Sequence, residues 1–385
     1  MISTTRRTPW REGIVAGLLA FAAFRVVTEL VGVAAAYRGG AAGRVARDPL
    51  AAFRVWQQWD VNWFADLSRR GYQAMGRVVN GTEVHDGTAF PPAMPALMHA
   101  GQVLGAPPAV SGILLSAVFL AIALALLYVL VRDDQNESIA RWTLVFLLVY
   151  PFALFLGTGY AESLVLLGTV GAWLAARRGA WWLAGMLVGV ALLAKIVFIL
   201  LLVPLSLEAM DWRGGRSLAF DRRRALRLVA LWLPALVALG GWMLYLGVIF
   251  GEPLRFLAAQ RGWGRAIGFP IAQVGYIFDR SRNAGVRFID AIDSLSLVLL
   301  AVMTVYVYRR VRPAYAALLG VLLAVFLFNT SLISNGRHLG VLFPIFIALA
   351  VMTEGRRWLR PVLVLVQLPL GLLLVTRFAT GHWAG

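Results

Sequence analysis

A tryptophan-rich stretch between Val55 and Tyr72 carries the residue types and spacing best suited to chemistry. Its aromatic and apolar residues recur with the spacing of one helix face, and they are Trp56, Trp59, Trp63, Phe64 and Leu67. Asp60 falls on this aromatic face, whereas Asp66 falls on the opposite, polar face. An apolar setting disfavours the ionised form of an acid, which suits a group that accepts a proton as a general base. The alternative for Asp60 is structural, as a helix N-cap or as the partner of a buried arginine.

Two other polar positions interrupt long apolar runs. Glu162, with Tyr160 just before it, lies near the end of one run, where an acid is usually paired or functional. We expect Glu162 to orient a substrate or to hold an arginine of the site. Lys195, the only lysine, lies between two apolar runs. It either contacts a phosphate or extends its side chain to the membrane interface.

Arginines of the C-terminal half are candidates for phosphate binding. Arg337 follows an Asn-Gly pair at the expected start of a helix, so its guanidinium and the helix N-terminus would meet a phosphate together. The neighbouring His338 would donate to the same phosphate. Arg261 and Arg265 flank Trp263 with helical spacing, which places them on one helix face. They would contact an anionic lipid headgroup or act only as interfacial anchors.

The composition places these residues in a membrane protein. Of the 385 residues, 60% are apolar or aromatic and 14% are charged, which is far more apolar material than a soluble core holds. Because ~20 apolar residues span ~30 Å of hydrocarbon, this suffices for roughly ten or eleven helices. Soluble enzymes and secreted disulfide scaffolds are excluded, and the absence of cysteine excludes thiolate sites. His85 and Asp86 alone are too few ligands to indicate a metal site.

Apolar runs and arginine clusters together predict the topology. The expected spans cover approximately 13–37, 107–131, 141–157, 159–176, 180–194, 196–210, 228–250, 288–308, 313–333, 338–354 and 359–378. The formal charge is +17, and arginine clusters between the runs place the N-terminus in the cytoplasm and the C-terminus outside. This alternation requires two spans that turn near Lys195. We expect one integral domain over 1–385, with two outer segments, 38–106 and 251–287, that pack together. Within the first span, Arg25 and Glu29 have the spacing of an ion pair.

Several motifs, in order along most of the chain, resemble one enzyme family. They are Trp59-Asp60 with Arg70-Gly71-Tyr72, Phe90-Pro-Pro-Ala-Met-Pro95, Tyr150-Pro151 with Tyr160-Ala-Glu-Ser163, Gly251-Glu-Pro-Leu-Arg-Phe256 with Gln260, Trp263 and Arg265, and Arg337-His-Leu-Gly-Val-Leu-Phe-Pro-Ile-Phe346. Together they resemble the PIG-V-type mannosyltransferases, the second mannosyltransferase of GPI-anchor assembly and its bacterial relatives. Ala161 and His338 depart from the commoner residues of these motifs, so the substrate can differ with them.

This resemblance implies an all-α, polytopic GT-C glycosyltransferase in a bacterial cytoplasmic membrane. It would transfer a mannosyl residue from a polyprenyl-phosphate sugar to a glycolipid or lipid-linked acceptor, with the active site on the extracytoplasmic face. We expect Asp60 to be the base of a single inverting displacement. The expected substrate contacts are Trp59, Trp63, Tyr160, Glu162, Lys195, Arg261, Arg265, Arg337 and His338. We expect no metal, no other cofactor and no nucleic-acid partner, because arginines would offset the charge of the leaving phosphate.

A transporter or flippase of an anionic lipid is the alternative function. Inverted repeats and interrupted helices at mid-membrane would favour it. The sequence contains no evident repeat, and its acids and bases gather near one membrane face instead. A cavity open on one side favours the enzyme, whereas a central, alternating cavity favours the transporter.

Overall fold

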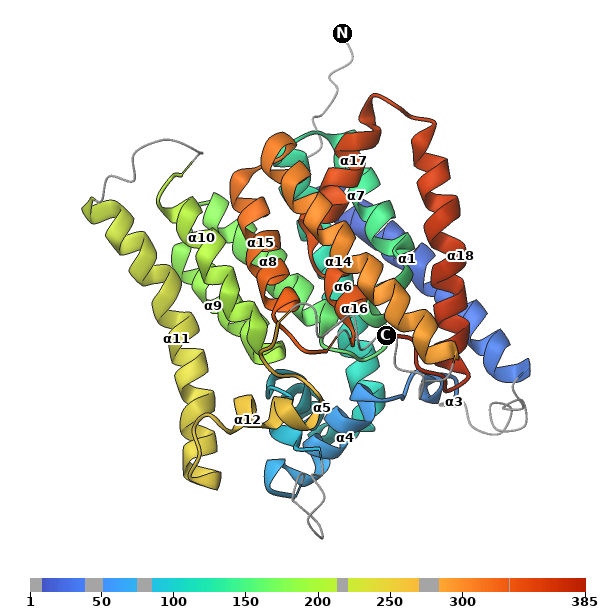
Figure 1. The fold of residues 1–385 in the computed structure, drawn as a ribbon, viewed down its shortest axis with the longest axis vertical. Helices are drawn as coiled ribbons and strands as arrows, with labels where there is room; N and C mark the ends of the chain where they lie inside the picture. The colour runs from blue at the N-terminus through green and yellow to red at the C-terminus, as the bar shows by residue number, and fades with distance from the viewer. Residues whose placement is uncertain (1–8, 39–50, 75–84, 213–220, 270–283, 332) are drawn as a thin grey trace.

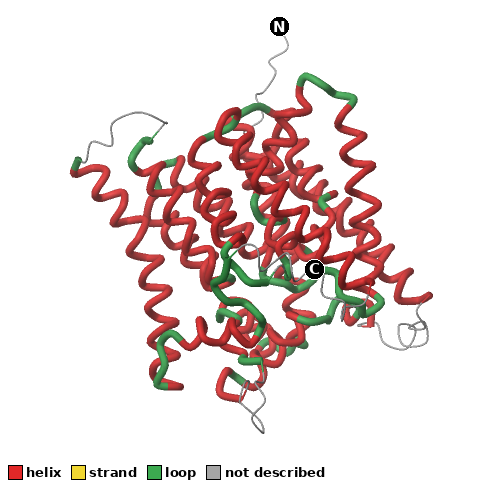
Figure 2. The backbone as a smooth tube through the Cα atoms, in the orientation of Figure 1, coloured by secondary structure: helices red, strands yellow, loops and turns green. Residues whose placement is uncertain are grey.

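The computed structural model describes residues 9–38, 51–74, 85–212, 221–269, 284–331 and 333–385. These residues form a bundle of long helices with several short helices gathered at one end (Figure 1). The described part of the chain has no β-strand, and Ile267 and Asn329 form one isolated bridge. In Figure 2 the described backbone consists of helices and the loops that connect them. The predicted all-α membrane protein is therefore confirmed.

Five helices of the described ranges are long and apolar enough to cross a membrane. They are α1 (Pro9–Ala36), α6 (Pro108–Asp134), α11 (Arg222–Phe250), α14 (Ala284–Arg310) and α18 (Leu359–Ala379). The shorter apolar helices of the bundle are α7 (Glu137–Val149), α8 (Glu162–Arg177), α9 (Trp181–Ala194), η5 (Ile196–Leu201) with α10 (Leu202–Ala209), α15 (Pro313–Leu327) and α17 (Phe343–Glu354). Each of the expected apolar runs overlaps one of these helices. The number of spans and their orientation remain predictions.

Short helices make up the end of the bundle that carries the Trp-Asp segment. They are α3 (Ala51–Arg54), α4 (Asp60–Arg70), η2 (Tyr72–Ala74), η3 (Gly87–Ala89), α5 (Ala93–Val103) and α12 (Arg255–Gly262). Two more, η4 (Pro151–Leu156) and α16 (Asn335–Leu339), lie between longer helices. The helix that the spacing over residues 55–72 predicts is present from Asp60 to Arg70 and ends at Gly71, but it does not include residues 55–59, because the chain breaks at Trp59, whose φ is 41°.

Packing against the C-terminal segment holds this break. The ring of Trp59 lies 5.1 Å from that of Phe378 and 5.4 Å from that of Trp383, edge-on to both. Asp60 consequently becomes the first residue of α4, where an acid is favoured by the helix dipole. The helix does bury one face, which includes Val61 and Phe64.

The region near Lys195 folds as a hairpin. Arg227, near the start of α11, donates to the carbonyl oxygen of Ala209 at 3.2 Å, and its guanidinium lies 5.7 Å from the ring of Trp181. The first residue of α9 and the last residue of α10 therefore lie at the same end of the bundle, with Lys195 at the turn. The expected turn near Lys195 is therefore present, whereas the crossing of the membrane by both helices stays a prediction. With 14 residues, α9 is only about 21 Å long.

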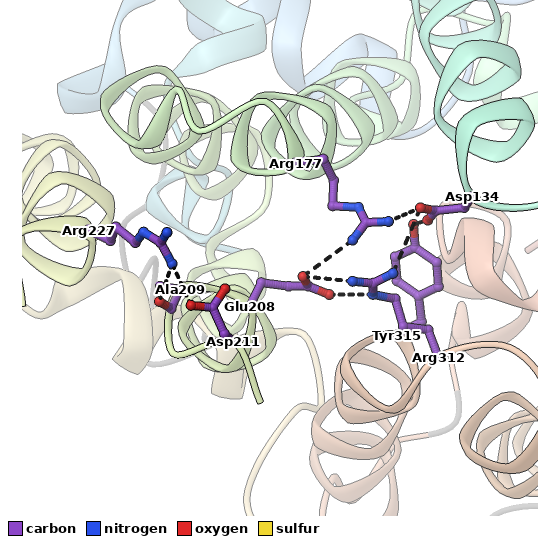
Figure 3. A network of polar contacts seen from close by, with 8 residues as sticks. All are labelled: Asp134, Arg177, Glu208, Ala209, Asp211, Arg227, Arg312 and Tyr315. Carbon is purple, nitrogen blue, oxygen red and sulfur yellow. Dashed lines mark hydrogen bonds and ion pairs between the residues drawn. The ribbon is translucent and has the colours of Figure 1, made fainter. Parts of the chain in front are cut away.

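Described arginines of the clusters that predicted the topology, such as Arg132, Arg177 and Arg312, lie at the end of the bundle opposite the short helices. Figure 3 shows Arg177, Arg312 and Tyr315 in contact with Asp134 and Glu208. Asp134 lies at the end of α6, Arg177 at the end of α8 and Glu208 near the end of α10, whereas Arg312 and Tyr315 lie at the start of α15. We call these five residues the arginine network. Their common location agrees with the alternation of spans. The predicted cytoplasmic cluster between 210 and 228 includes Arg213 and Arg216, which lie outside the described residues.

The described parts of the two expected outer segments contact each other. Nε of Arg255 lies 2.8 Å from Oδ2 of Asp86, and Nε2 of Gln260 donates to the carbonyl oxygen of Ala89 at 3.0 Å. Residues 39–50, 75–84 and 270–283 of these segments lie outside the described residues. In α1, Arg25 and Glu29 form the predicted ion pair.

Candidate active site

A cavity of about 200 Å³ lies where α4, the Lys195 turn and α16 meet. Its lining includes five predicted site residues, Asp60, Lys195, Arg265, Arg337 and His338, together with the polar residues Asn329, Ser334 and Asn335. Apolar side chains complete the wall, among them Phe90, Ile196, Val197, Trp263, Val325 and Phe326. The fold therefore brings residues from widely separated parts of the sequence to one cavity.

Arg337 links two acids of this region. Its Nη2 lies 3.0 Å from Oδ2 of Asp60, and its Nε lies 2.9 Å from Oε1 of Glu162. The guanidinium also lies over the rings of Phe155 and Tyr160, at 5.3 and 5.1 Å from their centroids. The setting expected for Asp60 is therefore wrong in one respect: it is aromatic on one side but contains a cation. The pairing with a buried arginine agrees with the structural alternative for Asp60, and it leaves a catalytic role untested.

Glu162 contacts two cations through one of its carboxylate oxygens, and its other oxygen has no partner among the described residues. Its Oε1 accepts a hydrogen bond from Nζ of Lys195 at 2.6 Å, besides the contact with Arg337. Oε2 of Glu162 and Nη1 of Arg337 are buried and have no hydrogen-bond partner among the described residues. Buried polar atoms of folded proteins are nearly always paired, so such exceptions indicate a place for a ligand or water. We call Asp60, Glu162, Lys195 and Arg337 the cavity cluster.

The ring of His338 has an assignable tautomer. Its Nδ1 lies 2.6 Å from the carbonyl oxygen of Ser334, which can only accept, so Nδ1 carries the proton. Nε2 lies 3.5 Å from Nζ of Lys195. In this neutral form Nε2 accepts a hydrogen bond. Donation from Nε2 to a phosphate would require the protonated ring, and this role of His338 stays a prediction.

A buried acid that the sequence reasoning missed supports the backbone beside Arg337. The carboxylate of Asp293, on α14, accepts hydrogen bonds from the backbone N–H groups of Gly336 and Ser334, at 2.7 and 3.1 Å. Ser334 has a φ of 69°, and a Cβ on Gly336 would lie 2.3 Å from the ring of Phe152. An acid inside an apolar run is itself a signal of function or pairing, and this rule would have found Asp293.

A helix begins at Asn335, as expected, but it is too short to present an N-terminus to a phosphate. Arg337 lies inside α16, which has five residues and ends before α17 begins. Pro344 in the first turn of α17 has no backbone N–H, so a helix starts readily there but does not extend back through it. Arg337 therefore acts through its side chain.

Arg265 reaches the cavity, whereas Arg261 does not. The helix α12 ends at Gly262, and Gly264, with a φ of 69°, reverses the chain. The expectation of one shared helix face is therefore wrong, and Arg261 is exposed. Burial, together with the like charge of Arg337, lowers the pKa of Arg265. Both causes disfavour its cationic form, and an anion bound in the cavity would relieve both.

The predicted aromatic contacts lie behind the cavity wall. The ring of Trp63 stacks on Phe90 at 5.6 Å and meets Trp263 edge-on at 5.4 Å, and both partners line the cavity. Tyr160 is buried, and its hydroxyl donates to the carbonyl oxygen of Gln58 at 3.4 Å. With Trp59, these rings shape the wall and position the residues that line it.

The residues around the site show no arrangement for a metal ion. Within the described ranges, no group of three or more histidines and acids lies close enough to hold one. His85 stacks on the ring of Trp263 at 4.2 Å, and Asp86 pairs with Arg255. Both residues therefore have structural contacts.

No family model matches the sequence, and no curated protein is similar to it. Among solved structures, the fold is similar to ArnT from Cupriavidus metallidurans bound to undecaprenyl phosphate, with 19% identity, a TM-score of 0.44 and 81% of this chain covered. It is also similar to the apo form of the Archaeoglobus fulgidus oligosaccharyltransferase, with 12% identity, a TM-score of 0.44 and 95% of this chain covered. The match covers 59% of the ArnT chain and 56% of the oligosaccharyltransferase chain, so this chain spans little more than half of either.

Proposed function

We propose that this chain is an inverting GT-C glycosyltransferase that moves a mannosyl residue from polyprenyl-phosphate-mannose to a glycolipid or lipid-linked acceptor on the extracytoplasmic face. The observation that carries the proposal is the lining of one cavity, where the carboxylate of Asp60 meets the three cations Lys195, Arg265 and Arg337. A volume of about 200 Å³ is comparable with that of one hexose. The choice of mannose and the GT-C assignment rest on the motifs shared with the PIG-V-type family.

The cavity offers distinct surfaces to the two ends of such a donor. The donor phosphate would lie against Lys195 and Arg337, whose charges favour an anion over a neutral group. The prenyl chain would leave along the apolar wall formed by η5 and α15. Val325 on that wall is 37% exposed, and Phe328 nearby is 51% exposed, so this side faces the lipid.

The reaction balances as one displacement. The acceptor hydroxyl gives its proton to the carboxylate of Asp60 while its oxygen forms the new bond to the anomeric carbon. The bond from that carbon to the phosphate oxygen breaks, and the electron pair leaves with the lipid phosphate. Arg337 moves its charge from Asp60 to the departing phosphate, which frees the carboxylate as the charge develops. A β-linked donor would therefore give an α-linked product.

The test is transfer by the purified protein in phosphatidylcholine vesicles. Radiolabelled polyprenyl-phosphate-mannose and extracted membrane glycolipids would be supplied, and the linkage of the product determined. We expect an α-mannosylated lipid, formed at the same rate with and without EDTA. Parallel assays with the glucosyl and aminoarabinosyl donors test the sugar. Movement of the donor across the bilayer without transfer would contradict the proposal and support the transporter.

A further inference from the structure

A second groove, of about 760 Å³, lies beside the cavity between the end of α4, α5, α9 and α11. Its apolar wall includes Leu193, Val237, Ala238 and Gly241. Val237 is 64% exposed, and α11 lies at the edge of the bundle (Figure 1). Because α11 is long and apolar enough to cross a membrane, this face meets hydrocarbon. The groove is therefore open to a lipid chain from the side.

The opposite end of the groove is cationic. Arg69 and Arg70 end α4 and line the groove, and both are exposed. Asp66 lies 3.5 Å from Arg69, at the long limit of an ion pair, and both side chains are more than 40% exposed. An exposed pair of this kind is weak. The rim thus has a surplus of positive charge next to an apolar trough, which matches a lipid with an anionic headgroup.

Aromatic rings connect the cationic rim with the apolar wall. Trp242 meets Tyr72 edge-on at 5.0 Å and stacks on Tyr245 at 5.5 Å. Trp242 is only 4% exposed, and its Nε1–H has no hydrogen-bond partner among the described residues. A buried indole N–H normally has an acceptor. An ester or phosphate oxygen at the base of a headgroup would supply one.

The groove and the cavity share a thin wall. Pro91 and Ala194 line the cavity, and their chain neighbours Pro92 and Leu193 line the groove. The acid end of the cavity, at Asp60, belongs to the same helix, α4, that ends at the cationic rim. The donor chain has its own apolar exit on the side of α15. A lipid in the groove would therefore approach Asp60 from the other side, as an acceptor must.

We propose that the groove between α5 and α11 binds the lipid anchor of the acceptor, and that this acceptor is an anionic membrane lipid. That the bound lipid is the acceptor rests on the proposed function, whereas the binding of an anionic lipid in the groove does not. Arg69 and Arg70 bind the headgroup charge, Trp242 donates to an oxygen at its base, and an acyl chain follows the α11 face. The sugar or polyol of the headgroup then extends past Pro92 toward Asp60.

Two neighbouring glycines of α11 provide a matched test. A Cβ added to Gly241 or to Gly240 meets no atom within 4 Å, so both positions accept a larger residue without a clash. Only Gly241 lines the groove, because successive helix residues point about 100° apart. Gly241→Leu fills the groove, and Gly240→Leu adds the same side chain outside it. Equal melting temperatures of the two variants would verify that both are folded.

The binding arm uses a phosphatidylglycerol probe with a diazirine in one acyl chain, in phosphatidylcholine bilayers. We expect Gly241→Leu to lower labelling of α5 and α11 peptides by about tenfold, which corresponds to ~1.4 kcal/mol, and Gly240→Leu to leave it unchanged. The double variant Arg69→Gln, Arg70→Gln should reduce labelling to that of the matching phosphatidylcholine probe. Equal labelling of both glycine variants and the parent would overturn the proposal.

The kinetic arm separates an acceptor from a bulk lipid. We expect Gly241→Leu to raise the KM for the glycolipid acceptor at least about fivefold, as losing ~1 kcal/mol of binding would, without changing the KM for the donor. Reduced labelling with an unchanged acceptor KM would mean that the groove holds only a bulk lipid, and the acceptor role would be wrong. If the parent protein binds the probe specifically but transfers no sugar, the proposed function fails while the groove remains an anionic-lipid site.

Discussion

The cavity cluster and the arginine network lie at opposite ends of the bundle, and both consist mainly of acids and cationic side chains. They differ in how many of their polar atoms have a hydrogen-bond partner. In the network, Arg312 contacts both oxygens of Glu208, from Nε at 2.5 Å and from Nη2 at 3.1 Å (Figure 3). Tyr315 and Arg177 each donate to an oxygen of Asp134. None of these side-chain atoms is among the buried atoms that lack a partner.

In the cavity cluster, by contrast, Lys195 and Arg337 both contact Oε1 of Glu162, and Oε2 has no hydrogen-bond partner among the described residues. Nη1 of Arg337 also has no hydrogen-bond partner among the described residues. Burying such atoms without partners costs about 1–3 kcal/mol each, so a cluster that served only stability would gain from pairing them. Of these two clusters, the one that joins helix ends has its named atoms paired, whereas the one beside the cavity keeps buried atoms without a hydrogen-bond partner among the described residues, where a ligand can bind. Substitutions in the two clusters should therefore separate activity from stability.

The largest effect on activity is expected from Asp60→Asn. Asparagine keeps the shape and polarity of the side chain but cannot take the proton of an acceptor. Loss of a general base lowers the rate by roughly 10²–10⁴-fold, measured as kcat of mannosyl transfer. Arg337 still has Glu162 as its partner, so the melting temperature in detergent should change little.

Asp66→Asn is the control in the same helix. Its side chain is 45% exposed and, among the described residues, pairs with Arg69 at 3.5 Å, so we expect a rate near that of the parent. A folded Asp60→Asn protein with near-normal turnover would show that the base is another residue. His338, whose Nε2 is an acceptor facing the cavity, would then be the next to test, followed by Glu162.

Arg337→Lys should have the second largest effect. Lysine retains the charge but cannot contact Asp60, Glu162 and a phosphate at once through a planar fork. Losing one charge-assisted hydrogen bond of about 1.5–3 kcal/mol predicts a decrease in kcat/KM for the donor of roughly tenfold to a hundredfold. Arg337→Ala should decrease it further. Equal activities of all three proteins at limiting donor would rule out a phosphate contact by Arg337.

Asp293→Asn should have a smaller effect, through the position of Arg337. The amide cannot accept from both backbone N–H groups, of Ser334 and Gly336, so one of the two hydrogen bonds is lost. We expect the KM for the donor to rise roughly tenfold, with a smaller change in kcat. Ser294→Ala is the control, because its hydroxyl donates within α14, to the carbonyl oxygen of Asp290. A loss of stability without any change of KM would mean that Asp293 only supports the fold.

Most helices could be predicted from the sequence, because an apolar run long enough to span a bilayer has few alternatives to a helix. The turn at Lys195 was predictable for a related reason, since the arginine clusters had to lie on one side. The break at Trp59 was not. It depends on rings of the last helix and the C-terminal segment, Phe378 and Trp383, and periodicity within residues 55–72 carries no information about them.

The site was predictable in its residue types but less so in its contacts. Asp60 and Lys195 were expected from their charge in aromatic or apolar surroundings and Arg337 from its place after an Asn-Gly pair, and all three line one cavity. Their mutual pairing depends on which helix ends meet in three dimensions. The tautomer of His338 and the support from Asp293 depend on backbone atoms near Ser334, whose left-handed conformation no local sequence preference indicates.

The smallest effect on activity, together with a clear effect on stability, is expected from Glu208→Gln in the arginine network. The amide keeps the shape but removes the charge that Arg312 and Arg177 share. Both arginine side chains are about a quarter exposed, at 23% and 27%, so the loss should be roughly 1–3 kcal/mol, below the ~3–5 kcal/mol of a fully buried pair. We expect a lower melting temperature in detergent and an unchanged kcat. Glu137→Gln breaks the exposed pair with Arg141 and should change neither, since such pairs contribute only about 0.3–0.5 kcal/mol. If Glu208→Gln instead abolished transfer at an unchanged melting temperature, saturation of hydrogen bonds would not distinguish the two clusters.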